Sequence, residues 1–310
     1  MPVWLITGAT GFLGRHVLAA LGEWRTSGVE VVTLGRRCPP RGTIQTFLKA
    51  DLDDPASVHR AIGVAAPAVV LHLAGQTPPA SPEQFYRVNT LATVHLLDAL
   101  RARGGAARVV LAGSAAELGP VELADLPVGE DHPCRPSESY GLSKLLATAA
   151  GLAARPPLEV IAARIFNPIG PGQPPSQAFG RFAARLAEGD PMPLTVGDLD
   201  IRRDFIDARD VARALIALAE SGRAGSVYHV GTGRSRCVRE GLDHLIRLSG
   251  RAVEVKADPR ASRNAGPRDS CADIRRIAAD TAWRPRVAWE QSLADLWDEA
   301  RSRSRLPLTA

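Results

Sequence analysis

The sequence lacks the features that would place it in a membrane, in a disulfide-stabilised fold or around a metal ion. No apolar run reaches the roughly 18 residues that a membrane-spanning helix needs, and residues 1–8 read as a first strand rather than a signal peptide. The four cysteines, Cys38, Cys134, Cys237 and Cys271, are scattered without a CxxC pair or a His-rich neighbourhood. We therefore expect reduced thiols, no metal site, no membrane partner and a cytoplasmic location.

Lysine is also scarce. Only Lys49, Lys144 and Lys256 are present, so the net charge of +5 comes almost entirely from arginine. The arginines are spread along the chain without a five-residue basic block, which argues against a nucleic-acid partner and favours an anionic small molecule. The 310 residues, 45% of them hydrophobic, suggest two lobes, because single cores stop growing at about 250 to 300 residues.

Short β-branched segments alternate with helix-length segments through the first half of the chain. Strands are expected over residues 3–7, 29–34, 68–74, 108–112 and 159–165. Helices are expected over residues 15–22, 55–62, 89–103 and 139–154. This alternation predicts an α/β fold with a Rossmann-type, doubly wound parallel sheet.

The pattern loosens from Asn167 onward into Pro- and Gly-rich loops, with helices expected near 179–188 and 238–248. We therefore predict a Rossmann domain over residues 1–166 and a smaller C-terminal domain over residues 167–310. The segment 204–231 is expected to pack back on the sheet, through a helix and a strand over 210–220 and 226–230. Residues 302–310 are predicted to be a frayed tail.

A glycine-rich segment follows the first expected strand and precedes the first expected helix. Its glycines allow a tight turn and a close approach of the backbone to a pyrophosphate, whose charge is stabilised at a helix N-terminus. This context predicts a dinucleotide-binding loop rather than an ordinary turn between a strand and a helix. The cofactor-binding residues expected in this loop are Gly8, Thr10, Gly11, Phe12, Leu13 and Gly14.

The end of the second expected strand bears on which nicotinamide cofactor is bound. NAD-binding proteins usually carry an acid there, which accepts hydrogen bonds from the adenosine ribose. In this chain the position reads Gly35, followed by Arg36 and Arg37. The repulsion against a 2′-phosphate is therefore missing, and two charge-assisted donors are present. We predict NADP(H) as the favoured cofactor and NAD(H) as the alternative, in which case the two arginines are ordinary solvated loop charges.

Tyr140 and Lys144 stand four residues apart, on one face of an expected helix. With three Tyr and three Lys in 310 residues, about 0.03 such pairs are expected by chance. Reduction of a carbonyl needs a proton donor, and a nearby cation lowers the pKa of a phenol towards the working pH. Ser114 follows an expected strand at the edge where open α/β sheets bind ligands, so its hydroxyl is a candidate to hold the substrate oxygen beside Tyr140. Taken alone, a serine in such a place is more often a turn or helix cap.

Seven segments of the chain carry a family resemblance: TGATGFLG, HLAG, GSAAELG, YGLSK, RIFNPIGPGQ, RRDFIDARDVA and YHVGTG. Together they resemble the extended short-chain dehydrogenase/reductases of the NAD-dependent epimerase/dehydratase family, over nearly the whole chain. Within that family, the stretch VGDLDIRRDFIDARDVARA with FNPIGPGQ before it is most similar to GDP-4-keto-6-deoxy-D-mannose reductases. The resemblance implies an NAD(P)-dependent enzyme that acts on a nucleoside-diphosphate sugar.

The resemblance also implies roles for individual residues. Along the cofactor, from the adenine to the nicotinamide ribose, it implies Asp51, Leu52, Leu73, Ala74, Gly75 and Asn89. It implies Ser114, Tyr140 and Lys144 as the catalytic triad, with Tyr140 and Lys144 also touching the cofactor, and Ser114, Asn167, Arg203 and Arg263 on the substrate. Arg263 lies ten residues before Asp273, but the Pro and Asp that usually follow it are missing, so Arg268 is a competing candidate. Without the family context, such arginines are more often in surface salt bridges.

Departures from the family pattern narrow the reaction. The 4,6-dehydratases of the family carry a Glu two residues after the catalytic Ser or Thr, and fucose-type epimerase/reductases carry a Cys there, whereas this chain has Ala116. Glu117 comes one place too late, and neighbours on an extended segment point in different directions. Leu118 replaces the usual Tyr, which leaves the sugar open. We expect a 4-ketoreductase, because Gly35 and the arginines after it favour NADP(H).

Two alternatives to the reductase stay open. A C4-epimerase would oxidise and reduce the same carbon and usually keeps NAD bound. A non-catalytic NADP(H)-sensing protein would hold the cofactor on this fold without turnover, although such proteins typically lack the Tyr and the Lys.

The helices expected over 89–103 and 139–154 resemble the pair that forms a four-helix interface between two subunits in this family. Their apolar positions Leu97, Leu145 and Leu152 would then face a partner subunit. The other interpretation is that these leucines face the sheet of their own subunit. We expect a homodimer.

Overall fold

The computed structural model describes residues 1–23, 28–40, 46–189, 193–258 and 268–304. Its central sheet has seven strands in the order β10-β6-β5-β4-β1-β2-β3, and every neighbouring pair is parallel. The strands are β1 Val3–Thr7, β2 Glu30–Gly35, β3 Thr46–Lys49, β4 Val69–His72, β5 Ala107–Ser114, β6 Leu158–Ile165 and β10 Val227–Val230. The predicted Rossmann-type fold is confirmed.

Helices cover both faces of this sheet because its strands are apolar on both sides. One face is covered by α1 Phe12–Glu23, α7 Ala208–Ser221 and α9 Arg275–Thr281. The other face is covered by α2 Pro55–Ala65, α4 Ala92–Arg103 and α5 Ser139–Leu152. Alternate residues of β1 divide between the two cores: Trp4 and Ile6 pack on the first face, and Leu5 on the second.

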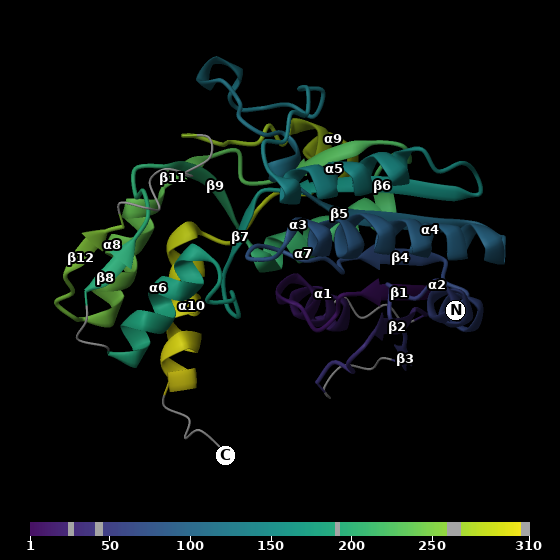
Figure 1. Ribbon diagram of the computed structural model, residues 1–310, viewed down its shortest axis with the longest axis horizontal. Coiled ribbons are helices and arrows are strands. Elements are labelled where there is room, and N and C mark those ends of the chain that lie inside the picture. Colours follow the sequence, from purple (N-terminus) through teal and green to yellow (C-terminus); the bar gives the residue numbers. More distant parts are fainter. Residues whose placement is uncertain (24–27, 41–45, 190–192, 259–267, 305–310) are drawn as a thin grey trace.

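A second core lies beside the sheet, formed by α6 Ala178–Glu188, α8 Val238–Ser249 and α10 Trp289–Ser304. These three helices stand apart from the large sheet, on the left of Figure 1. Two small sheets accompany them, with the orders β11-β9-β7 and β12-β8. Their strands are β7 Asn167–Ile169, β8 Leu194–Val196, β9 Arg202–Asp207, β11 Ser235–Cys237 and β12 Val255–Ala257.

Three buried carboxylates join the segment 204–210 to the C-terminal part of the chain. Asp204, Asp207 and Asp210 are each at most 3% exposed, and each accepts hydrogen bonds from residues far along the sequence. The donors are the backbone N–H groups of Thr232, Gly233 and Ala272 for Asp204, the hydroxyl of Ser292 for Asp207, and the N–H groups of Arg286 and Val287 for Asp210. These contacts hold the smaller core against the sheet.

The structure differs from the expectations in several elements. The edge strand β3 was not expected from the sequence. The helix expected over 89–103 begins earlier: α3 Pro82–Phe85 starts at a capping box made by Ser81 and Gln84, and the π-helix η1 Tyr86–Leu91 joins it to α4. Residues 302–304 belong to α10, so the prediction of a frayed tail is wrong for them. The short helices are η2 Ala115–Glu117 and η3 Leu123–Asp125.

One residue of the expected outward face of α4 and α5, Leu97, is corrected. Leu97 is only 8% exposed and packs in the core of its own subunit, because its position on α4 faces the sheet. Leu145 and Leu152 are half-buried. The large apolar side chains that are exposed are Leu91 at the end of η1, Val94 on α4, and Leu142 and Leu146 on α5. In the described residues, no helix is long and apolar enough to cross a membrane.

Candidate active site

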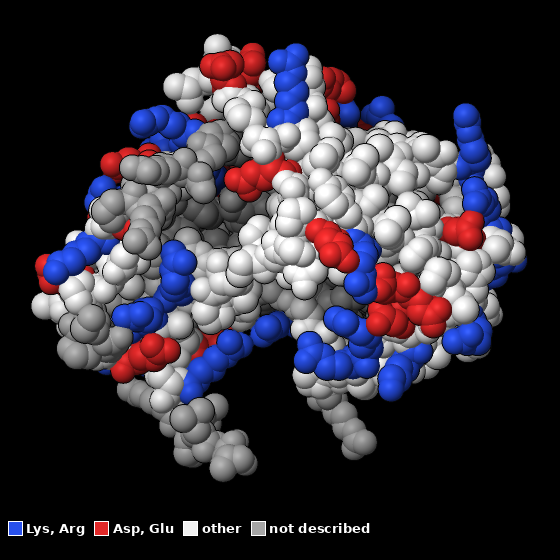
Figure 2. Space-filling view, viewed as in Figure 1, with Lys and Arg blue, Asp and Glu red and all other residues white. Residues whose placement is uncertain are grey.

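The carboxyl ends of the parallel strands open into a cavity of about 750 Å³. Figure 2 shows the surface hollowed between the sheet and the smaller core. Open parallel sheets bind ligands at this edge, and the volume is that of a small-molecule site. The predicted site residues that line it are Gly8, Gly11, Phe12, Leu13, Gly14, Leu73, Gly75, Asn89, Ser114, Tyr140, Lys144, Asn167 and Arg203.

All three glycines of the loop after β1 line the cavity, and the fold itself requires two of them, Gly8 and Gly14. A Cβ atom on Gly8, whose φ is +69°, would lie 2.6 Å from Ala74 N, and one on Gly14 would lie 2.2 Å from Gly8 O. A Cβ on Gly11 would meet only Gly8 O, at 3.2 Å, among the described atoms within 4 Å. Helix α1 begins directly after it, at Phe12, where the first N–H groups lack helical partners. The loop therefore fits a pyrophosphate.

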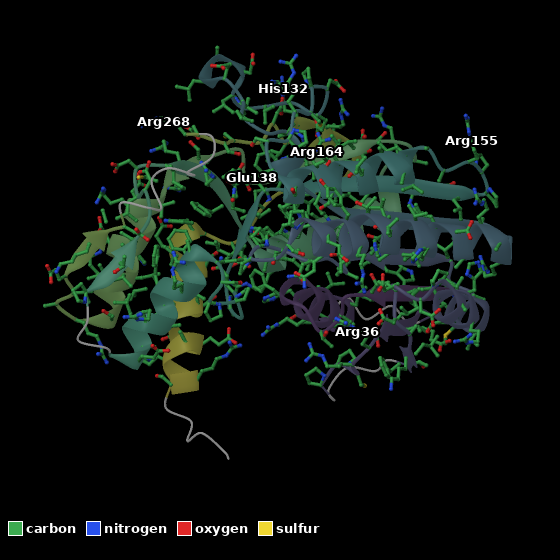
Figure 3. All side chains as sticks on the ribbon, in the orientation of Figure 1. Arg36, His132, Glu138, Arg155, Arg164 and Arg268 are labelled. Carbon is green, nitrogen blue, oxygen red and sulfur yellow. The ribbon has the colours of Figure 1, made fainter. Side chains whose placement is uncertain are left out.

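Some of the predicted cofactor residues do not line the cavity: Thr10, Arg36, Arg37, Asp51, Leu52 and Ala74. Arg36 and Arg37 are exposed just after β2, and Figure 3 shows Arg36 at that edge of the sheet. Asp51 follows β3, and β3 pairs in parallel with β2, which pairs with β1. These residues therefore share the edge that carries the glycine loop, where the surface is open rather than enclosed.

Asn89 lies in the π-helix, a distortion that is frequent at functional sites. Its side chain accepts a hydrogen bond from Gln76 N at 2.7 Å and donates to Gln76 O at 3.1 Å and to Ser143 Oγ at 2.9 Å. A Cβ on Gly75 would lie 3.1 Å from Asn89 Oδ1 and 3.8 Å from Lys144 Nζ. Asn89 therefore joins the turn after β4 to helix α5, at the place where Lys144 enters the cavity.

Tyr140 and Lys144 lie on α5, beside Ser114 at the end of β5. Burial raises the pKa of Tyr140, a hydrogen bond with the Ser114 side chain lowers it, and the charge of Glu117 raises it. Burial lowers the pKa of Lys144, and Glu117 opposes this. From the sequence we expected Lys144 to lower the pKa of Tyr140. In the structure the pKa of Tyr140 is instead raised, because burial is the largest effect on the phenol.

A buried chain of hydrogen bonds behind this site was not expected from the sequence. Ala74 N donates to Thr7 Oγ1 at 3.2 Å, Thr7 Oγ1 lies 2.8 Å from His72 Nδ1, and His72 Nε2 lies 3.0 Å from Thr93 Oγ1. Thr93 donates to Asn89 O at 2.7 Å. Every donor has an acceptor if His72 is neutral with its proton on Nε2. Burial lowers the pKa of His72 to about 3, which keeps it neutral.

The far end of the cavity carries the predicted substrate residues. Asn167 donates to Asp204 O at 3.1 Å, and Arg203 lines the cavity on the neighbouring strand β9. Burial lowers the pKa of Arg203, and the charge of Asp269 opposes this. Arg263 lies outside the described residues. Arg268 is exposed and does not line the cavity, whereas the next residue, Asp269, does. Figure 3 shows Arg268 at the upper left of the molecule.

Ala116 and Leu118 line the cavity beside Ser114, whereas Glu117, between them, does not. Glu117 is fully buried and turned to the other side, towards Arg164. The acidic residues that line the cavity in the described part of the chain are Glu138 and Asp269, neither of which the sequence pattern indicated. Glu138 immediately precedes α5 and can be followed in Figure 3.

Comparison with known proteins supports this arrangement. GDP-6-deoxy-D-mannose reductase from Pseudomonas aeruginosa is 33% identical, with 97% of each chain covered. dTDP-6-deoxy-L-talose 4-dehydrogenase (NAD(P)(+)) from Kitasatospora kifunensis is 31% identical, with 94% of this chain and 93% of that protein covered. The structure of RMD from Pseudomonas aeruginosa complexed with NADPH superposes with a TM-score of 0.86 and 31% identity, covering 98% of this chain and all of that one.

Residues 4–231 match the model of the NAD dependent epimerase/dehydratase family. The matched segment contains the glycine loop, the π-helix with Asn89, and Ser114, Tyr140 and Lys144. With the parallel sheet and the cavity at its carboxyl edge, this match shows that the chain belongs to the NAD dependent epimerase/dehydratase family, the extended short-chain dehydrogenase/reductases.

Proposed function

We propose that this protein is an NADP(H)-dependent reductase of a nucleoside-diphosphate sugar with a 4-keto group, of the 4-keto-6-deoxyhexose type. The observation that carries the proposal is the meeting of Ser114, Tyr140 and Lys144 in one cavity, between the glycine loop and Arg203. Position 116, which faces the same cavity, is alanine, so it lacks the carboxyl group that the 4,6-dehydratases carry there. The two curated relatives described above, a reductase and a 4-dehydrogenase of 6-deoxy sugar nucleotides, support the same substrate class.

The roles of the residues follow from their positions. The nicotinamide cofactor, when bound, would supply a hydride for the carbonyl carbon. Tyr140 gives its phenolic proton to the carbonyl oxygen, which Ser114 holds in place through its hydroxyl. Lys144, beside Gly75, binds the ribose of the cofactor and stabilises the phenolate that remains. Gly11 leaves space for the pyrophosphate of the cofactor, and Arg203 binds the diphosphate of the substrate.

The decisive test is Tyr140→Phe, which keeps the ring but removes the proton donor. Steady-state reduction of GDP- or dTDP-linked 4-keto-6-deoxy sugars by NADPH should show a kcat lower by about 10² to 10⁴-fold, with NADPH binding nearly intact. Near-normal turnover would mean that another group is the acid. Lys144→Ala should lower both kcat and NADPH affinity, and Ser114→Ala should cost less than either change.

The cofactor preference is a second prediction. Since Gly35 brings no carboxylate and Arg36 and Arg37 are exposed at the adenosine edge, NADPH should bind at least about tenfold tighter than NADH, or about 1.4 kcal/mol. Both dissociation constants are measured by fluorescence titration. Arg36→Ala with Arg37→Ala should remove the difference, whereas Arg155→Ala, on the loop after α5 far from this edge in Figure 3, should not. A preference for NADH in the unchanged protein contradicts the proposal.

The alternative functions are separated by the same assay. A C4-epimerase would interconvert two nucleotide sugars without net consumption of NADPH, and a non-catalytic sensor would bind NADPH without turnover. The cytoplasmic location stays a prediction.

We also propose that residues 1–166 with 204–231 form the cofactor domain and that 167–310 are mainly the substrate domain. The pairing of β10 with β6 and the separate core of α6, α8 and α10 support this division.

We further propose a homodimer formed through η1, α4 and α5. Leu91, Val94, Leu142 and Leu146 are each at least 38% exposed, and they are among the few large apolar side chains that the described residues leave open to solvent. Exposed apolar side chains gathered on neighbouring helices are typical of an interface.

A further inference from the structure

Glu117 is a buried carboxylate that the proposed reaction does not use, although it lies directly beneath Ser114. It is 0% exposed. One oxygen, Oε1, accepts hydrogen bonds from Ser114 N at 2.8 Å and from Thr148 Oγ1 at 3.2 Å. The other, Oε2, accepts from Arg164 Nε at 3.1 Å. A single side chain therefore connects the end of β5, the helix α5 and the strand β6.

Arg164 is itself held from two further sides. It is 3% exposed, its Nη1 lies 3.2 Å from His229 Nε2, and its Nη2 donates to Cys134 Sγ at 3.1 Å. His229 Nδ1 lies 3.0 Å from Val128 O, so this nitrogen carries the proton and Nε2 accepts from the guanidinium. Arg164 lies near the end of β6, and Figure 3 labels it beside α5.

The backbone around Glu117 makes room for this arrangement. A Cβ atom on Gly113 would lie 2.6 Å from Glu117 Oε1, so only glycine admits the carboxylate at this place. A Cβ on Gly141 would lie 2.3 Å from Ala116 O, so α5 packs directly on the turn 115–117. Tyr140, next to Gly141, depends on this contact for its position.

A buried ion pair is an expensive way to stabilise a fold, since well-packed apolar residues of similar volume are often as stable or more so. We propose that Glu117 is a positioning residue that holds Ser114 and helix α5 in their catalytic arrangement and keeps a fixed negative charge behind Tyr140 and Lys144. This inference rests on the proposed function for the meaning of that arrangement. Arg164 serves by holding the carboxylate in place.

The charge of Glu117 acts on both catalytic groups in the same direction, raising the pKa of Tyr140 and that of Lys144. Other ionisable groups near the pair are Glu138, which precedes α5 and lines the same cavity, and His72 from β4, which burial keeps neutral. Arg164 and His229 from β6 and β10 lie behind Glu117. Removing the charge at position 117 should therefore lower the proton affinity of the phenol.

The first test is a titration that needs no turnover. The chain has three tyrosines, so the ultraviolet absorbance of tyrosinate, compared with that of Tyr140→Phe, isolates Tyr140. In Glu117→Gln the midpoint of Tyr140 should lie at lower pH than in the unchanged protein. An unchanged midpoint overturns the proposal. If Glu117→Gln does not fold because Arg164 loses its partner, the double variant Glu117→Gln with Arg164→Gln removes both charges. Its midpoint should still lie below that of the unchanged protein, by less than in Glu117→Gln, because no unpaired cation remains.

The second test separates position from charge in the reductase assay. Glu117→Gln keeps an oxygen for Ser114 N, so its main change should be a basic limb of the pH–rate profile at lower pH. Glu117→Leu removes the acceptor as well and should lower kcat by on the order of 10²-fold with the NADPH dissociation constant nearly unchanged. Equal kcat values in Glu117→Leu and the unchanged protein overturn the positioning role.

A matched control is Glu159→Gln. Glu159 accepts a hydrogen bond from Arg108 at 2.7 Å, so this pair also joins β5 and β6, but at the opposite end of the strands and at the surface. Its loss should leave the titration and the profile unchanged, and a shift as large as that of Glu117→Gln overturns the proposal. Inactivity of the unchanged protein on every keto sugar nucleotide would contradict the proposed function instead, while the tyrosine titration would still test Glu117.

Discussion

Two deeply buried histidines make the stability of this protein depend on acid. Burial lowers the pKa of His72 and of His229 from the ordinary 6.5 to about 3, with the charges of Lys144 and Arg164 acting in the same direction. As the pH falls below 6.5, the unfolded chain binds protons that the folded chain does not. Each histidine should therefore lower the free energy of unfolding by about 1.4 kcal/mol per pH unit between about pH 6.5 and pH 3, and nothing is lost above that window.

Urea unfolding at about pH 7 and about pH 5.5 measures this dependence. His72→Asn keeps an acceptor for Thr7 but cannot be protonated, so its stability should fall less between the two pH values than that of the unchanged protein. His59→Gln, on the surface of α2, is the control and should behave like the unchanged protein. Identical pH dependence in His72→Asn would show that His72 is not responsible.

Among the elements, the glycine loop is expected to contain both residues needed for folding and a residue needed for the cofactor. Gly11→Ala should leave the free energy of unfolding within about 1 kcal/mol, since its Cβ meets only Gly8 O at 3.2 Å, but should weaken NADPH binding at least about tenfold by filling the pyrophosphate cradle. Gly14→Ala places a Cβ 2.2 Å from Gly8 O and should also destabilise the fold, by about 1–3 kcal/mol.

Gly22→Ala is the control for both changes. Gly22 is exposed on α1 with nothing within 4 Å of its Cβ position, so alanine should raise the free energy of unfolding by about 0.5–1 kcal/mol without affecting the cofactor. The measurements are thermal unfolding without ligand and titration with NADPH. Unaltered NADPH affinity in Gly11→Ala would exclude the loop as the pyrophosphate site.

For the whole molecule, the exposed apolar face of η1, α4 and α5 predicts the assembly. Leu146→Glu places a charge in the proposed interface and should convert a dimer into a monomer, as measured by light scattering at micromolar concentration. Leu248→Glu is a matched control, because Leu248 on α8 is 37% exposed against 42% for Leu146 and lies outside this face. A monomer in the unchanged protein refutes the dimer.

The sequence by itself determined the features that depend on neighbours along the chain. The alternation of apolar segments predicted the parallel sheet, because strand and helix periods are local properties. The spacing of Tyr140 and Lys144 placed both on one helix face, and the glycine pattern placed the cofactor loop after β1, where the cavity opens. These predictions needed no knowledge of long-range contacts.

Only the tertiary structure decided what lies around those residues. Glu117 meets Arg164 across 47 positions, and Thr7 meets His72 across 65, so no local pattern indicates either contact. Leu97 turned out to be buried and Leu146 exposed, because the direction of each helix face depends on where the sheet lies. The balance of burial and charge at Tyr140 was also beyond the sequence, since the packing of distant segments determines how much water reaches a buried group.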